Sequence, residues 1–214
     1  MVRLVSLFAA ITAITFLSAP GLSSGWFWDA GNALGFCALA GLVYLSMPGA
    51  PRRDLRRHEA VGYAVLTVSV LHGLWFLLGD AAAVEWIKPG APLSMWTGIG
   101  GLIALTALIF LAVMPTRMKV HRRYGVFVRW HRVIAWIAAA GVVHHIVATG
   151  FYVHTRLQAL LLISLVALAA LIRPWWVRNR TGPINLPAAG PFLVVVLTLV
   201  TTAVFTTLRL PAAP

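Results

Sequence analysis

The sequence predicts an all-α protein, a polytopic membrane helical bundle of six or seven transmembrane helices in one domain, residues 1–214. Of these residues 60% are apolar and only 10% charged, whereas soluble domains carry about 25% charged residues. The mean hydropathy is +0.88. This composition excludes a soluble enzyme. The single cysteine, Cys37, excludes a disulfide framework, a zinc cluster and an iron–sulfur site.

Seven apolar runs approach the roughly 20 residues that a helix needs to cross a ~30 Å hydrocarbon core. Pro20-Gly21 ends the first and Pro48 the second. The first run follows Met1-Val2-Arg3, as in a signal peptide, but no A-x-A-like cleavage site follows it. Seven spans are therefore expected, with six as the alternative if the first is cleaved. In order they cover about residues 4–19, 31–47, 60–79, 95–114, 133–153, 157–172 and 191–208.

The positive charges predict the orientation, because Lys and Arg stay on the cytoplasmic side of a membrane. With the N-terminus inside, 14 of the 17 Lys and Arg lie in inner segments, and only Lys88, Arg156 and Arg209 lie outside. The net charge of +12 is thus explained without nucleic acid. We expect a multi-pass protein of the cell inner or plasma membrane with a cytoplasmic N-terminus.

Histidines recur at matched depths in the third and fifth runs. His58 and His72 are 14 residues apart, about 21 Å along a helix and within about 40° of one face. His131 precedes His144 by 13 residues and His145 by 14. Both runs are predicted to cross from inside to outside, so they present imidazoles at the same two levels.

This pattern suits bis-histidine binding of two haems. His58 would pair with His131, and His72 with His144 or His145. Two strong axial ligands suit haem iron that only passes electrons, and an ionisable residue inside a bilayer is by default a functional candidate. The alternative is that these histidines only form hydrogen bonds between helices.

Arginines flank the inner histidines: Arg56 and Arg57 beside His58, and Arg129 and Arg132 beside His131. A guanidinium binds a carboxylate through two parallel hydrogen bonds. Arg57 and Arg132 are therefore candidates to bind haem propionates. The alternative is simple retention of positive charge at the inner face.

Two stretches carry a resemblance: Arg56-Arg57…Gly62-Tyr63-Ala64…Leu71-His72 and Arg129-Trp130-His131-Arg132…Gly141-Val142-Val143-His144. They resemble the ferric-reductase-like transmembrane domain family, which includes NADPH oxidases, ferric reductases and the haem-binding membrane subunit of the bacterial methionine-sulfoxide-reductase system. The chain's size is most similar to that subunit. It departs from it at His58, where the subunit lacks a histidine, and in a seventh span.

The resemblance implies haem b and bears on the choice between His144 and His145. A spacing of 13 in the family favours His144 as the ligand, whereas ideal helix geometry favours 14, and so His145. We expect His144, with His145 as the alternative. A local helix distortion near Gly141 would reconcile the two spacings.

The expected function is transmembrane electron transfer by a di-haem b cytochrome, as the membrane subunit of a reductase system. No catalytic residue is expected. Gly98, Gly100 and Gly101 form no dinucleotide fingerprint and are predicted to be packing glycines. Electrons would come from a cytoplasmic flavoprotein, free flavin or a quinol, and would pass to an outer-face reductase partner. The alternatives are a self-sufficient ferric or oxygen reductase, or a haem-free small transporter or assembly protein.

Overall fold

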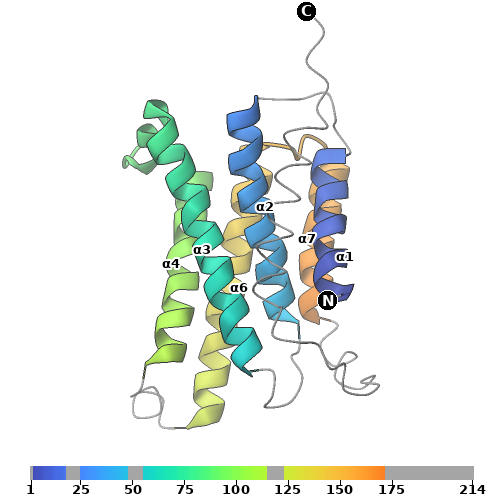
Figure 1. The fold of residues 1–214 in the computed structure, drawn as a ribbon, viewed down its shortest axis with the longest axis vertical. Coiled ribbons are helices and arrows are strands. Elements are labelled where there is room, and N and C mark those ends of the chain that lie inside the picture. Colours follow the sequence, from blue (N-terminus) through green and yellow to red (C-terminus); the bar gives the residue numbers. More distant parts are fainter. Residues whose placement is uncertain (1, 18–24, 48–54, 115–122, 172–214) are drawn as a thin grey trace, which may run out of the picture. The chain divides into compact units, whose positions relative to one another are not determined.

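The computed structural model describes residues 2–17, 25–47, 55–114 and 123–171, which form helices and short turns with no β-strand among them. This confirms the all-α prediction (Figure 1). In order the elements are α1 (Val2–Thr12), the π-helix η1 (Ala13–Leu17), α2 (Trp26–Ser46), α3 (Leu55–Gly79), the 3₁₀ helix η3 (Ala81–Ile87), α4 (Leu93–Val113), α6 (Tyr124–Thr149) and α7 (Arg156–Leu171).

Four of the described helices, α2, α3, α4 and α6, are long and apolar enough to cross a membrane. Two shorter apolar helices cover Val5–Thr15 and Arg156–Ala169. The fold is therefore a membrane helical bundle, in which each helix satisfies its own backbone hydrogen bonds. The predicted run at 191–208 lies outside the described residues.

The helices extend beyond the predicted apolar runs at their arginine-bearing ends. α3 begins at Leu55 rather than at residue 60, and α6 begins at Tyr124 rather than at residue 133. The runs were bounded by arginines, but a charged side chain at the interface does not interrupt helical hydrogen bonding. His58 and His131 consequently lie inside helices. At its other end α6 stops at Thr149, and Gly150 follows with a φ of 72°.

The chain divides into two compact units, and the first takes in Met1–Ala81 and Gly150–Pro214. Within it α2 packs against α1, α3 and α7. The middle of α2 is buried, with Leu39 and Val43 at 1% exposure or less. Gly41 of α2 faces Val65 of α3, where a Cβ would collide with the valine side chain. This close approach of the two helices places the α3 histidines.

A capping box starts α7. The main-chain N–H of Gln158 donates to the Thr155 hydroxyl oxygen at 3.1 Å, and the main-chain N–H of Thr155 donates to Gln158 Oε1 at 3.0 Å. Gln158 Nε2 also donates to the Ile14 carbonyl oxygen at 3.0 Å. The buried glutamine therefore joins the start of α7 to η1.

A buried carboxylate joins α2 to the turn before α7. The Tyr152 hydroxyl donates to Asp29, and both side chains are at most 2% exposed. Tyr152 has a φ of 62°, in the left-handed region that non-glycine residues seldom adopt. Asp29 lies in the first turn of α2, where the helix dipole favours a negative charge. The predicted second run begins at residue 31, after Asp29, so this contact was not predicted.

The second unit, Ala82–Thr149, consists mainly of α4 and α6 packed along one another. A Cβ on Gly141 would lie 2.9 Å from the Thr97 carbonyl oxygen, and one on Gly101 would lie 2.9 Å from Val142 Cγ2. The packing role is confirmed for Gly98 and Gly101, whereas no atom of the described residues lies within 4 Å of a Cβ on Gly100. α6 is a continuous α-helix through Gly141, so no break at this glycine reconciles the spacings of 13 and 14 residues.

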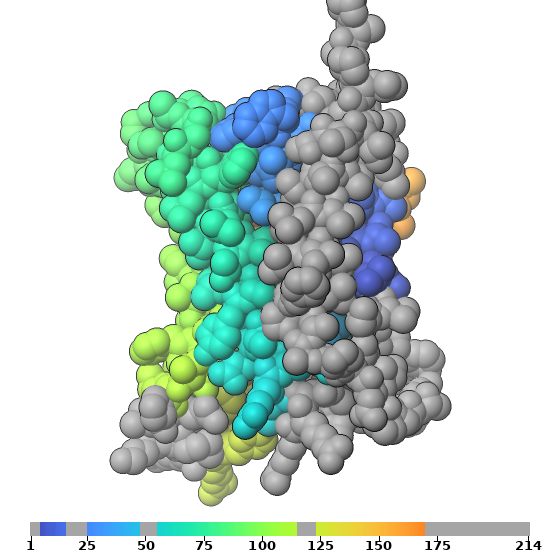
Figure 2. Space-filling model, in the orientation of Figure 1, coloured from blue at the N-terminus to red at the C-terminus, as the bar shows by residue number. Residues whose placement is uncertain are grey.

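Large apolar side chains face outward in both units, as a lipid-facing surface requires. On α3, whose surface is visible in Figure 2, Leu71 is 49% exposed and Leu78 is 84% exposed. On α4, Ile103 and Phe110 are each 64% exposed. In water such surfaces would mark an interaction site; in a membrane protein they fit contact with acyl chains.

Candidate functional site

His72 of α3 lies half-buried against α2. Its Nδ1 is 2.7 Å from the carbonyl oxygen of Gly31. A carbonyl only accepts hydrogen bonds, so Nδ1 carries the proton and donates it. In the neutral ring Nε2 is then the unprotonated nitrogen, the kind of atom with which histidine binds a metal.

A glycine one helical turn further along α2 makes room for this ring. A Cβ on Gly35 would lie 2.8 Å from Cε1 of His72. The edge of Phe76 meets the imidazole with 5.4 Å between ring centroids. Gly31 and Gly35 form a G-x-x-x-G motif, a signal of close helix packing in membranes that was present in the sequence but was not used.

Aromatic side chains surround this end of α2 and α3. Trp75 Nε1 donates to the Phe27 carbonyl oxygen at 2.9 Å, and the two rings stack with centroids 5.5 Å apart. Trp28 stacks on Phe151 at 5.8 Å. The cluster gives the region near His72 an apolar, water-excluding lining.

The other histidine of α3, His58, is exposed near the Leu55 end of the helix, beside the half-buried Arg57. The helix is unbroken between His58 and His72. The spacing of 14 residues therefore corresponds to about 21 Å along the axis. The two levels at which α3 and α6 would present their histidines stay a prediction.

In the second unit, His145 of α6 docks on α4 much as His72 docks on α2. It is half-buried, and its Nδ1 lies 2.9 Å from the Ser94 carbonyl oxygen. A Cβ on Gly98 would lie 2.9 Å from Cγ of the ring. As with His72, the carbonyl requires the proton on Nδ1 and leaves Nε2 with its lone pair.

His144, the neighbour of His145, is exposed and bonds to a side chain instead. Its Nδ1 lies 2.9 Å from the hydroxyl oxygen of Thr97. Thr97 in turn donates its hydroxyl proton to the Ser94 carbonyl oxygen at 2.9 Å. Neither Thr97 nor Ser94 was singled out from the sequence, because their positions relative to the histidines depend on the register of α4 against α6.

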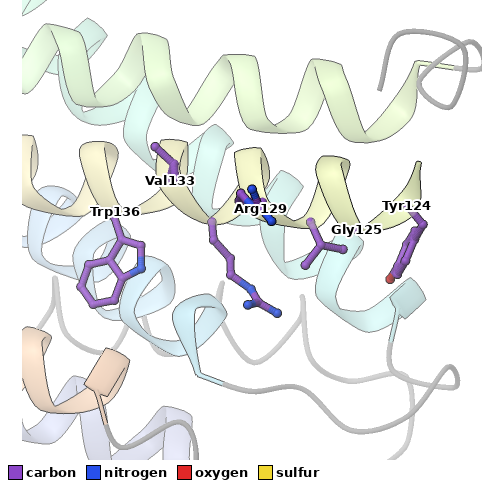
Figure 3. A pocket seen from close by; sticks show the side chains of 7 residues that line it. Tyr124, Gly125, Arg129, Val133 and Trp136 are labelled. Carbon is purple, nitrogen blue, oxygen red and sulfur yellow. The ribbon is translucent and has the colours of Figure 1, made fainter. Parts of the chain in front are cut away.

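His131 lies half-buried near the Tyr124 end of α6, with its ring centroid 5.6 Å from that of Phe127. A pocket of about 540 Å³ opens on another face of the same helix stretch (Figure 3). Arg129 and Arg132 line it together with Val133 and Trp136. Two guanidinium groups beside the apolar side chains of Val133 and Trp136 suit an amphiphilic ligand that carries carboxylates.

In the structure His58 and His72 thus lie on one helix, α3, and His131, His144 and His145 lie on another, α6. The pairing of α3 with α6 histidines stays a prediction. Among the described residues no group of three or more His, Cys, Asp or Glu could hold a metal ion. A bis-histidine haem takes only its two axial ligands from the protein, so the chemistry of the donor set fits that group.

Comparison with known proteins gives one match. Residues 48–142 match the model of the ferric reductase like transmembrane component family. The match takes in α3, η3 and α4, together with α6 up to Val142, and includes His58, His72 and His131. It confirms the resemblance found in the sequence. No curated protein and no solved structure matches the chain.

Proposed function

We propose that this ferric-reductase-like membrane protein transfers electrons across the bilayer as a di-haem b cytochrome, the membrane subunit of a reductase system. The observation that carries the proposal is the family match, which includes three of the four expected ligand histidines, His58, His72 and His131. The fourth, His144, lies just beyond it on the same helix as His131.

We assign His58 and His131 to a first haem and His72 and His144 to a second. When bound, haem b supplies an iron that takes up and gives up one electron at a time. The protein would supply Nε2 lone pairs, and the hydrogen bonds at Nδ1 of His72 and His144 place the proton on the other ring nitrogen. A metal-binding histidine characteristically donates its other ring N–H in this way.

Exposure favours His144 over His145. The His145 ring lies against Gly98, docked on α4, whereas His144 is exposed on α6 and can present its ring to a group outside this helix pair. His145 remains the alternative, and a specific observation supports it: its carbonyl and glycine contacts match those of His72.

Arg57 and Arg132 are proposed to bind haem propionates. Arg132 lines the pocket in Figure 3 beside Arg129. Within the described residues, no carboxylate forms an ion pair with Arg129 or Arg132. These guanidiniums are therefore available to pair with carboxylates of a bound group.

The donor acts at the cytoplasmic face, and the acceptor is an outer-face reductase partner. Fourteen of the 17 Lys and Arg lie in segments expected on the cytoplasmic side of the cell inner or plasma membrane, where the N-terminus also lies. This positive surface would attract an anionic donor such as a flavoprotein or a free flavin phosphate. A quinol would instead reach the protein from the lipid.

The visible spectrum of the purified protein tests the proposal. A b-type Soret band and a dithionite-induced α band are expected. The double variant His72→Ala/His144→Ala should lose the part of both bands that the second haem contributes. His154→Ala is the matched control, because His154 is exposed in the turn before α7 and is not a proposed ligand. Purified wild-type protein without any porphyrin would refute the proposal.

A second measurement separates a subunit from a complete reductase. The purified protein is supplied with reduced flavin alone, and superoxide and ferrous iron are assayed. Reduced flavin without protein is the blank, because it forms both products by itself. A subunit that depends on an outer partner should not raise either rate above this blank. A large protein-dependent increase in either rate would instead identify a self-sufficient ferric or oxygen reductase.

A further inference from the structure

We propose that Thr97 is a positioning residue for the second haem: its hydroxyl fixes the tautomer and the orientation of the His144 imidazole. This inference rests on the proposed function, in which His144 binds iron through Nε2. It goes beyond that function because Thr97 itself touches neither haem nor substrate in the proposal and acts only through His144.

The hydrogen-bond pattern determines which atom carries the proton. Thr97 has one hydroxyl proton, which it donates to the Ser94 carbonyl oxygen at 2.9 Å. Its oxygen therefore acts only as an acceptor toward His144 Nδ1, 2.9 Å away. With the threonine proton assigned to the Ser94 carbonyl, Nδ1 carries the imidazole proton and Nε2 carries the lone pair.

Thr97 is itself held in place where α4 and α6 approach each other closely. Its carbonyl oxygen lies where a Cβ on Gly141 would be only 2.9 Å away. Gly141 is one turn before His144 on α6. The backbone contact and the side-chain hydrogen bond therefore join the same two turns, so the hydroxyl has a fixed position from which to orient an otherwise exposed ring.

The hydrogen bond also affects the electronic properties of the ligand. An acceptor on Nδ1–H raises the electron density at Nε2, which stabilises ferric over ferrous iron. Loss of such an outer contact typically changes metal affinity or activity by about 10–100-fold. A tenfold change in the ferric-to-ferrous ratio corresponds to about 59 mV for a one-electron couple.

The experiment is a redox titration of the purified holoprotein, followed by visible absorbance and by low-spin ferric EPR. Thr97→Val keeps the side-chain shape and removes the acceptor. The midpoint potential of one haem should rise by about 59 mV, which corresponds to a tenfold change in the ferric-to-ferrous ratio. The EPR g-values of that haem should also change. Thr97→Ser keeps the hydroxyl and should restore the wild-type values.

Thr106→Val is the matched control. Thr106 lies on the same helix, is exposed, and donates to the Leu102 carbonyl oxygen at 2.9 Å. It has no histidine partner among the described residues. Its replacement should change neither potential nor g-values. If Thr97→Val does not yield folded protein, Thr97→Ala gives the same comparison against Thr97→Ser.

The outcomes separate this inference from the function on which it rests. Wild-type protein with two haems, and unchanged potentials and g-values in Thr97→Val, would overturn the role of Thr97 and leave the electron-transfer proposal intact. A Thr97→Ser variant that behaves like Thr97→Val would also overturn it, because the hydroxyl would not be the active element. Wild-type protein without haem would refute the proposed function and, with it, this inference.

Discussion

The two helix pairs, α2 with α3 and α4 with α6, hold a histidine in the same way. In the first pair His72 donates to the Gly31 carbonyl and lies over Gly35; in the second His145 donates to the Ser94 carbonyl and lies over Gly98. In both pairs the glycine follows the carbonyl by one helical turn. The second pair differs in having an additional histidine, His144, which bonds to the hydroxyl of Thr97.

The difference shows two ways to fix an imidazole in a membrane. A ring docked over a glycine is held by main-chain atoms and by close packing, and it is partly buried. A ring on the exposed side of its helix needs a side chain to hold it. Both arrangements put the proton on Nδ1, so the choice of ligand on α6 depends on accessibility rather than on tautomer.

Replacing each histidine of α6 in turn tests this comparison with the largest expected effect. His144→Ala should lose the second haem, which is measured as haem per protein by the pyridine haemochrome assay. His145→Ala should keep both haems and lose some stability, because it removes a docked ring. The reverse result would show that the arrangement shared with His72, and not exposure, identifies the ligand.

An alanine at Gly98 tests how much the docked ring contributes to α4–α6 packing. Its Cβ would lie 2.9 Å from Cγ of His145, an atom that cannot move far from the backbone. Overpacking of this kind costs about 1–3 kcal/mol, so the melting temperature in detergent should fall. Gly100→Ala is the control, since Gly100 has open space around it. Equal melting temperatures for the two variants would argue against the docking contact.

The smallest expected effect concerns the hydrogen bond between Trp75 of α3 and Phe27 of α2. Within the described residues, the α4–α6 pair has no such tryptophan contact. Trp75→Phe removes the hydrogen bond from the indole to the Phe27 carbonyl and should cost about 1 kcal/mol. Thermal melting monitored by circular dichroism measures the loss. Trp96→Phe on α4 is the control, because within the described residues the Trp96 indole forms no hydrogen bond. A larger loss at Trp96 would contradict this view of the two pairs.

The sequence predicted the helical membrane fold because long apolar runs have few other stable structures in lipid. The helix ends were less predictable, since α3 and α6 continue through Arg57 and Arg129 into the interface. Candidate ligands were visible as histidines in apolar segments. Their partners were not: Gly31, which accepts from His72, precedes it by 41 residues, and only the packing register brings such pairs together.

The G-x-x-x-G of α2 was the clearest cue to this packing in the sequence. It indicates that α2 meets a neighbour closely through Gly31 and Gly35, but not that the neighbour contributes a histidine. The Ser94–Gly98 pair is a weaker cue of the same kind. Small residues one turn apart in a membrane span, facing a span with a histidine, therefore predict a docked imidazole.

The oxygen that receives the His72 proton belongs to the peptide backbone. No codon change at position 31 can delete it; only a displacement of the whole helix would. The oxygen that receives the His144 proton belongs to a threonine side chain. It is lost with a single base change to an alanine or isoleucine codon. Under the proposed function, attempts to change the potential of the second haem by mutation should therefore begin at position 97.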